Sequence, residues 1–564
     1  MKKIYSILLA ITALGTTSCS DFLDLIPLND IVAENYWTER ADLQSVLYGC
    51  YSQLESADVM QRMFVWGEVR SDNITKAAPT PYDLQQIIDE NILETNPWVN
   101  WTSIYQLINR CNTVIYYAPI VAEKDPNYNE SEVRANIAEA TFLRSLAYFY
   151  LIRTFRDVPY TTKPSLDDNH IDEDYRLPAT PFAEVLDNLI TSLESVKGDA
   201  LRLYPIESGT GDAANTSRVT TCAIYALLAD LYLWKGDYQQ CANYCDQVLA
   251  YKMERYEELK DETPDMAARI ELWFEKYPLL MEQPSGNSQG AAYNDIFGEG
   301  NSFESIFELY FYNSRSGENQ LVSKFFGYGN NANTAEGQCA VYSGLITGVY
   351  DKTNLVFKPT DCRVPECIEE RGSDSYFIRK YAYQEASFSI DNKSSNISKP
   401  NRPGTMRSTN YSNWIVYRLT DVMLMKAEAL VEMGSTEQQD EAFEIVSAIY
   451  NRGNNFNAAS TEMLARENYL TQQQMRELVL EERRRELLFE GKRWFDLVRY
   501  SLRMGNNNYM VTAVKQKQKE RVSAIALQLQ DRNALFWPYL EAELDANPLL
   551  KQNEAYLKNE TSQK

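Results

Sequence analysis

The stretch RVTTCAIYALLADLYLWKGDYQQCANYCDQVLA, residues 218–250, contains the pattern on which the predicted fold rests. Its apolar residues recur every three or four positions, as they do on one face of a helix. They are Ile224, Leu227, Leu228 and Leu231 in a first run, and Val248 and Leu249 in a second. Gly236 and Asp237 lie between the runs and indicate a tight turn. Residues 218–252 are therefore predicted to form two antiparallel helices.

Paired helices are predicted at several further places along the chain. Residues 418–452 contain two amphipathic runs around a glycine, and helical segments are predicted at 101–155 and 475–500. Small residues and a Gly-Asp-Tyr turn at this spacing resemble a tetratricopeptide repeat, in which paired helices pack closely. The stretches at about 60–100 and 283–412 are predicted to be loop-rich. We therefore expect a mainly α fold, with four tetratricopeptide-like helix pairs as a scaffold for large irregular insertions.

The first 24 residues, MKKIYSILLAITALGTTSCSDFLD, have the organisation of an export signal. Two lysines precede an apolar run at residues 4–14, which is shorter than the roughly 20 residues needed to span a bilayer. Cys19 follows this run and indicates a bacterial lipoprotein whose thiol takes an acyl chain. We predict a signal peptide at 1–18, a lipidated Cys19 and a single domain over 19–564. The alternatives are a secreted protein in which Cys19 is coincidental, or a retained membrane anchor.

The charge of the chain limits its partners. The formal net charge is −24, and it becomes −26 when the signal peptide takes away two lysines. Phosphate backbones and anionic lipid headgroups repel such a chain. Nucleic acid is therefore not expected as a partner, and the membrane is expected to be reached through the acyl chain. Because one acyl chain anchors only marginally, stable attachment implies several.

Catalytic patterns are sparse in this sequence. The only histidine, His170, lies in the acidic run DDNHIDED and is interpreted as a solvated loop residue, which argues against a Ser-His-Asp triad. The densest acidic cluster, in EERRRELLFEGKR from Glu481, alternates with arginines at helical spacing. That spacing favours ion pairs over a catalytic pair of carboxylates. We predict that the protein is not an enzyme, and a surface glycosidase is the alternative.

No metal site or cofactor is predicted. One histidine and the absence of any Cys-x-x-Cys pair argue against a zinc site of the usual kind. A structural calcium ion stays open, although no motif indicates one. Eight cysteines follow Cys19, and their spacing compels no disulfide. Cys362 and Cys367 flank a short loop segment and either pair or stay free.

The chain is rich in aromatic residues, with 38 Tyr, 21 Phe and 9 Trp. Tyr and Trp offer an apolar ring and a polar tip, which suits sugars with their apolar faces and hydroxyl groups. Rings on predicted helices are assigned to the core. Rings in predicted loops are the candidates for ligand contact, and they are Tyr82, Trp98, Phe325 and Tyr328.

Seven segments of the chain, in the same order, resemble those of one known family. The segments begin at Cys19 (CSDFLDLIP), Trp101 (WTSIYQLIN), Phe142 (FLRSLAYFYLIRTFRDVPY), Glu304 (ESIFEL), Arg418 (RLTDVMLMKAEAL), Glu481 (EERRRELLFEGKRWFDLVR) and Leu535 (LFWPYLEAELDANPLLKQNEAY). On these motifs the chain resembles the SusD/RagB family of outer-membrane lipoproteins of Bacteroidota. It departs from the family where Arg156 replaces a usual glycine, where Tyr539 and Leu540 replace Ile-Pro, and where Ala555 replaces the final glycine.

The resemblance implies a function that the residues alone do not. It implies a lipid-anchored protein on the surface of the outer membrane that binds oligosaccharides or polysaccharides. Such a protein delivers its ligand to a TonB-dependent SusC-like barrel, and its helical scaffold supports an irregular, loop-rich ligand-binding half. Peptide capture, as in RagB-like uptake lipoproteins, is the alternative. The family's binding aromatics lie in the regions that hold Tyr82, Trp98, Phe325 and Tyr328 here, although no motif matches them one for one.

Overall fold

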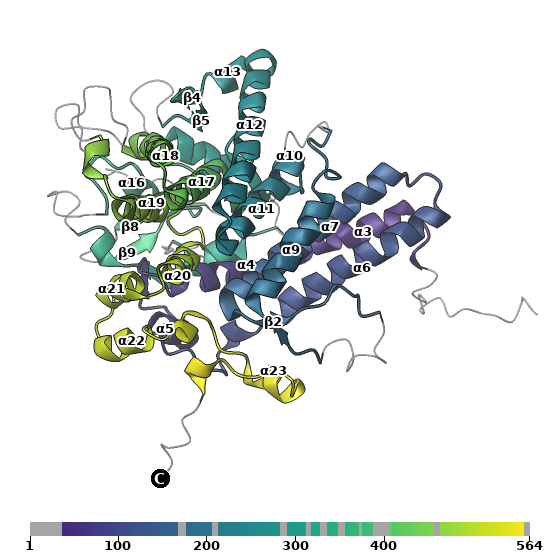
Figure 1. Cartoon of the computed structure of the whole chain (residues 1–564), viewed down its shortest axis with the longest axis horizontal. Coiled ribbons are helices and arrows are strands. Elements are labelled where there is room, and N and C mark those ends of the chain that lie inside the picture. Colours follow the sequence, from purple (N-terminus) through teal and green to yellow (C-terminus); the bar gives the residue numbers. More distant parts are fainter. Residues whose placement is uncertain are drawn as a thin grey trace, which may run out of the picture.

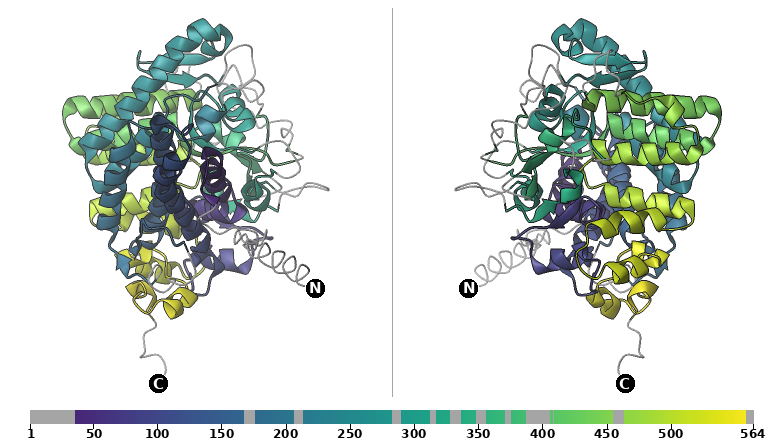
Figure 2. Two further views of the ribbon diagram at one scale, coloured as in Figure 1. Left: turned by 90° about the vertical axis from the view of Figure 1, so that its right-hand side faces the viewer. Right: turned by 90° about the vertical axis from the view of Figure 1, so that its left-hand side faces the viewer.

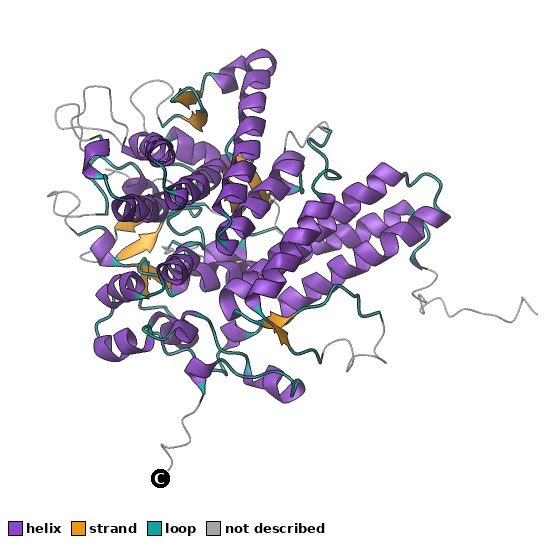
Figure 3. Ribbon diagram, viewed as in Figure 1, coloured by secondary structure: helices purple, strands orange, loops and turns teal. Residues whose placement is uncertain are grey.

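The computed structural model is mainly helical, as predicted, and its strands are few and short (Figures 1 and 3). Cys19, His170 and Tyr328 lie outside the residues that it describes. The described residues are 36–166, 176–205, 213–282, 290–311, 317–327, 336–347, 356–370, 375–386, 406–407, 409–454 and 463–557. Among these residues, no helix has both the length and the apolar character needed to cross a bilayer.

Long antiparallel helices form the first part of the scaffold (Figure 1). They are α3 (Arg40–Leu54), α6 (Thr102–Lys124), α7 (Glu130–Phe155) and α9 (Phe182–Val196). The N-terminus of α7 is capped by Asn129, whose side chain accepts a hydrogen bond from the Glu132 backbone N–H at 3.1 Å. Every residue of α7 from Ala138 onwards is buried, because α3, α6, α9 and α11 pack around it. From Ala138 onwards the helix therefore lacks the exposed polar face of a surface helix.

The second part contains the helices predicted from residues 218–252, 418–452 and 475–500. They are α11 (Thr221–Lys235), α12 (Tyr238–Glu262), α17 (Leu419–Met433), α18 (Thr436–Asn454), α19 (Gln472–Glu486) and α20 (Arg493–Met504). Gly236 ends α11 with a φ of +81°, and the Asp237 side chain then accepts a hydrogen bond from the first turn of α12. Helix α17 packs against α12, α18 and α19, which joins the pairs into one body.

Short strands lie in and around the stretch predicted as loop-rich at 283–412 (Figure 3). A four-stranded antiparallel sheet has the order β1 (Ile74–Lys76), β7 (Cys339–Val341), β9 (Tyr376–Ile378), β8 (Ile368–Glu370). The antiparallel pairs are β6 (Ser305–Leu309) with β10 (Trp414–Arg418), β2 (Val158–Pro159) with β3 (Ala179–Thr180), and β4 (Ile270–Trp273) with β5 (Tyr277–Leu280). Both β6 and β10 are buried along their whole length, so this pair belongs to the core.

The stretch at 60–100 holds more regular structure than its predicted loops. Helix α4 (Ala57–Phe64) continues into a π-helical turn at Val65–Val69, and α5 (Tyr82–Ile88) and a 3₁₀ turn at Pro97–Val99 follow. Gly67 looks like a helix breaker in the sequence, but here it permits a close approach of two backbones. A Cβ atom on Gly67 would lie 1.8 Å from the carbonyl oxygen of Gly491.

Short helices complete the chain. They are α10 (Ala214–Ser217), α13 (Pro264–Ala267), α14 (Ala291–Tyr293), a π-helical turn at Asn294–Glu299, α15 (Gln320–Phe325), 3₁₀ turns at Ser343–Leu345 and Arg466–Asn468, α16 (Arg363–Cys367), α21 (Asn508–Gln516), α22 (Val522–Gln528), 3₁₀ turns at Arg532–Leu535 and Glu554–Tyr556, and α23 (Glu541–Ala546). The last of these return to the start of the chain, where Arg70 donates hydrogen bonds to the carbonyl oxygens of Ala534 (2.8 Å) and Leu535 (3.2 Å). Helices α12 and α13 lie at one end of the molecule, and α5, α22 and α23 at the other (Figures 1 and 2).

Candidate functional site

Among the predicted ligand-binding rings that the structure describes, Tyr82 is the most exposed. It is the first residue of α5 and follows Pro81, whose extended backbone (φ −70°, ψ 160°) forms the N-cap of the helix. The turn before the helix is held by two hydrogen bonds of 2.7 Å, from Gln85 to the Thr80 carbonyl and from the Thr80 hydroxyl to the Gln338 carbonyl. The side chain of Tyr82 is free to meet a ligand, since 73% of the residue is exposed.

Trp98 lies beside this helix, in the 3₁₀ turn at Pro97–Val99. The Asn96 side chain caps the turn by accepting a hydrogen bond from the Trp98 backbone N–H at 3.0 Å. The indole N–H of Trp98 donates to the Asp83 carboxylate at 2.7 Å and so ties the ring to α5. Only 6% of Trp98 is exposed, so a ligand would reach an edge of the ring rather than a whole face.

Two cations surround the ring of Trp98. The Lys324 ammonium lies 5.0 Å from the ring centroid and the Arg62 guanidinium carbon 5.8 Å from it, within reach of cation–π attraction. Lys324 also donates a hydrogen bond of 3.1 Å to the Gln61 side chain. We call Arg62, Tyr82, Asp83, Trp98 and Lys324 the Trp98 site. It combines one exposed ring with hydrogen-bonding groups of both charges.

Phe325 corrects the expectation that its ring lies in a loop. It is the last residue of α15 and is completely buried, because Leu321, Val322 and Phe325 form the apolar face of that helix. Its ring stacks on Phe64 with centroids 5.3 Å apart and lies 5.9 Å from the ring of Trp98. The ring of Phe325 therefore packs near Trp98 in the core and is not exposed to solvent.

Sequence reasoning missed the polar members of the Trp98 site. Asp83 and Lys324 are direct neighbours of the named aromatics in the sequence, and that adjacency was the only available signal. The structure joins them because α15 packs against α4, and α5 packs against the π-helical turn that continues α4. Tyr328 is outside the described residues, so its predicted role stays a prediction.

The acidic cluster of α19 forms buried ion pairs, as its alternation with arginines predicts. Glu486 pairs with Arg363 (3.1 Å), Arg418 (2.7 Å) and Arg452 (2.6 Å), which come from α16, β10 and α18. Burial alone would raise the pKa of Glu486, but these arginines outweigh burial and hold the pKa well below its usual range. Glu490 pairs in the same way with Arg418 and Lys380. The basic partners of Glu486 and Glu490 therefore lie on other elements, whereas the sequence spacing predicted ion pairs within the helix itself.

The cysteines and the acidic residues do not form a metal site in the part of the chain that the structure describes. Within it, no three His, Cys, Asp or Glu side chains are grouped to hold an ion. The eight cysteines after Cys19 are all buried and free, which answers the open question about Cys362 and Cys367. Burial raises the pKa of the Cys367 thiol to about 12, so this sulfur is held as an unreactive thiol.

Two family models together match most of the chain. The model described as "SusD family" matches residues 304–556, and the model described as "Starch-binding associating with outer membrane" matches residues 21–233. The chain belongs to the SusD/RagB family. A SusD-like protein of Formosa agariphila is 25% identical to it over 99% of this chain and 100% of that protein. A second SusD-like protein of the same organism is 26% identical over 90% of this chain and 92% of that protein.

Solved structures share the SusD fold with this chain. A SusD superfamily protein from Bacteroides vulgatus has a TM-score of 0.64 at 18% identity, covering 92% of this chain and 100% of that one. A laminarin-binding SusD-like protein has a TM-score of 0.61 at 19% identity, with the same coverages. At such identities the likeness shows the fold alone.

Proposed function

We propose that this protein is a glycan-binding lipoprotein of the outer-membrane surface. It captures oligosaccharides or polysaccharides and delivers them to a TonB-dependent SusC-like transporter, and its lipidated Cys19 holds it at the membrane. Membership of the SusD family supports this role, and one structural relative is described as laminarin-binding. The name of the second matching family model supports an outer-membrane location.

The observation that carries the proposal is the Trp98 site. The exposed ring of Tyr82 gives a sugar an apolar surface to stack on, and the next residue, Asp83, holds the Trp98 ring in place. Asp83 accepts hydrogen bonds from sugar hydroxyls, while Lys324 donates them. Arg62 holds the site in place, because its guanidinium already donates to Asp58 and to the carbonyl oxygens of Pro97 and Asn100. Because these groups are held by α4, α5 and α15, the site is built before the ligand arrives.

Isothermal titration of the full-length protein against plant, host and microbial oligosaccharides tests this proposal. For the glycan that binds, Tyr82→Ala should weaken affinity at least tenfold, because the stacking ring is lost. Tyr116→Ala is the matched control, since Tyr116 is another exposed tyrosine (47%) and lies on α6. Equal losses in the two variants, or binding of mixed peptides without any glycan, would overturn the proposal.

A further inference from the structure

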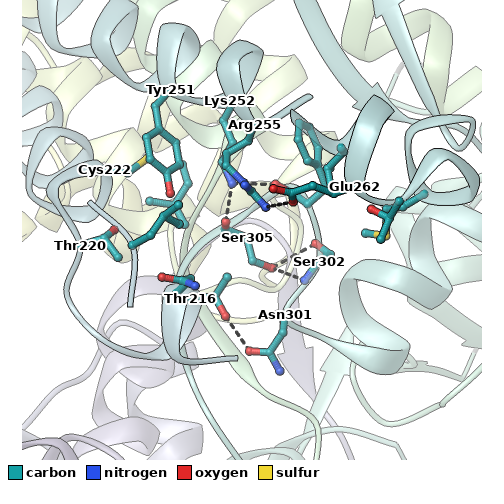
Figure 4. Close-up of a pocket in the computed structure, with 17 residues that line it drawn as sticks. Thr216, Thr220, Cys222, Tyr251, Lys252, Arg255, Glu262, Asn301, Ser302 and Ser305 are labelled. Carbon is teal, nitrogen blue, oxygen red and sulfur yellow. Dashed lines mark hydrogen bonds and ion pairs between the residues drawn. The ribbon is translucent and has the colours of Figure 1, made fainter. Parts of the chain in front are cut away.

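A cavity of about 260 Å³ lies between α12, α10 and the residues that lead into β6 (Figure 4). It is lined by the part of α12 that leads to α13, whereas α5, which carries Tyr82 and Asp83, lies near the opposite end of the molecule (Figure 1). We propose that this α12 cavity is a second binding site, which takes one ring of a carboxylated sugar such as a hexuronic acid. The proposal does not depend on what the Trp98 site binds.

The charge of the cavity wall favours a monoanion. Lys252, Arg255 and Glu262 are the charged side chains among its lining residues, which gives the lining a formal charge of +1; Glu258, which pairs with Arg255, is not a lining residue. Lys252 is buried, and its ammonium donates hydrogen bonds to the carbonyl oxygens of Phe303 (2.6 Å) and Ser305 (2.7 Å). These bonds fix the inner end of the wall.

Arg255 is the group that would hold the carboxylate. Its side chain is only 14% exposed, and Figure 4 shows it reaching from α12 toward the cavity beside Lys252. One guanidinium nitrogen, Nη1, donates to Glu258. The other, Nη2, lies 3.7 Å from Glu262, which exceeds hydrogen-bonding distance. Because a guanidinium carries five N–H donors, it keeps donors for the two oxygens of a carboxylate.

Hydroxyl groups lie on the opposite wall of the cavity. The Ser302 and Ser305 hydroxyl oxygens are 3.0 Å apart, and Thr216 donates a hydrogen bond of 2.6 Å to the Asn301 side chain (Figure 4). The Thr216 oxygen retains acceptor capacity for a sugar hydroxyl, whereas the Ser305 oxygen already accepts a hydrogen bond from the Ser302 backbone N–H at 3.1 Å. Leu259 and Met266 add apolar surface for the ring.

The size of the cavity selects one ring rather than a chain. Pockets for drug-sized ligands usually measure about 300–1,000 Å³, so a cavity of about 260 Å³ suits a smaller molecule. A neutral sugar has no carboxylate, so it would not supply the charged acceptor that we propose for the Arg255 guanidinium. A dianion such as a phosphate ester would exceed the available positive charge beside Glu258 and Glu262.

Isothermal titration of the full-length protein in detergent tests the proposal, with D-galacturonate and D-glucuronate as probes. D-galactose and D-glucose are the uncharged controls. A uronate should bind with one site per chain and the neutral sugars at least tenfold more weakly. No uronate binding, or equal binding of the neutral sugars, would overturn the proposal.

Three variants locate the site. Arg255→Gln should weaken uronate binding at least tenfold, while Arg202→Gln should not, because Arg202 also pairs with Glu258 but does not line the cavity. Tyr116→Ala, at an exposed tyrosine of α6 outside both sites, should leave uronate binding unchanged. Equal losses from Arg255→Gln and Arg202→Gln, or a loss from Tyr116→Ala, would refute the assignment.

A fourth variant covers the case in which Arg255→Gln fails to fold. Met266→Trp fills the cavity from its wall and should abolish uronate binding while Arg255 stays in place. Undiminished binding to this variant would also refute the assignment. The uronate ring could come from the end of a polysaccharide chain or from a free monosaccharide, and titration with a trigalacturonide distinguishes the two. If the trigalacturonide binds as tightly as the monomer, the cavity takes the end of a chain. If its affinity is lost, the cavity takes only the free monosaccharide.

Discussion

Arg156 ends α7 in a backbone conformation that residues with a side chain rarely adopt. Its φ is +70° and its ψ −78°, and the Asp157 N–H donates to the Phe155 carbonyl at 3.1 Å. This is the strained form of the γ-turn. The SusD family usually has glycine at this position, and the structure supplies the reason: glycine has no Cβ to resist a positive φ.

Arg156→Gly should raise the free energy of unfolding by about 1 kcal/mol, because it relieves this strain. The lost hydrogen bond to Asn533 is exposed and is worth little. Urea denaturation measures the change. Arg156→Ala is the control, since it removes the same side-chain contacts but keeps the strain. Equal stability of the glycine and alanine variants would contradict the strain argument.

Glu68 makes stability depend on pH. It is completely buried, and burial raises its pKa to about 7 although hydrogen bonds from Asn73 and from backbone N–H groups oppose the shift. The unfolded chain releases this proton near pH 4.5, whereas the folded chain keeps it up to about 7. The contribution of Glu68 to stability is therefore full below pH 4.5 and is lost as pH rises to about 7.

Glu68→Gln should remove this dependence. The free energy of unfolding of the natural protein, minus that of the variant, should fall by up to about 3 kcal/mol as the pH rises from 4.5 to 7.5. The variant is therefore favoured at high pH. Urea denaturation of both proteins across this range measures the difference. Parallel pH profiles would mean that Glu68 ionises at its ordinary pKa.

At the scale of elements, the π-helical turn at Val65–Val69 packs closely against the turn after α19, and the two backbones meet at Gly67 and Gly491. Gly67→Ala should lower the free energy of unfolding by at least about 2 kcal/mol, because its Cβ would collide with the backbone of Gly491. Gly49→Ala is the matched control in α3. It meets no atom within 4 Å and should stabilise the helix by about 0.5–1 kcal/mol. A harmless Gly67→Ala would show that the two backbones can separate freely.

One carboxylate of α19, that of Glu486, pairs with arginines of α16, β10 and α18. Glu486→Gln should destabilise the protein by about 3–5 kcal/mol, since it leaves three buried arginines without their shared counter-charge. Glu477→Gln, on the exposed face of the same helix, should change stability by less than about 0.5 kcal/mol. Thermal and urea unfolding compare the two. Similar small effects would mean that the buried network relaxes without Glu486.

At the scale of the whole molecule, the proposed anchor and the folded body have separate tasks. Cys19→Ala should abolish surface retention, measured by cell fractionation and protease accessibility. The Trp98 site is built from residues of α4, α5, α15 and the turn at Pro97–Val99, far along the chain from Cys19, so ligand affinity should stay as in the natural protein. Weaker glycan binding by the purified variant would contradict this division.

The sequence by itself determined the helical class, the positions of the main helix pairs and the family. Helical spacing, caps and turn glycines such as Gly236 are local signals, so they can be read without knowing what packs where. Only the tertiary structure decided that Phe325 is buried, that Glu486 meets three arginines from other elements, and that Lys324 lies over Trp98. These contacts join segments far apart in the chain, and they depend on how the elements pack rather than on the spacing of neighbouring residues.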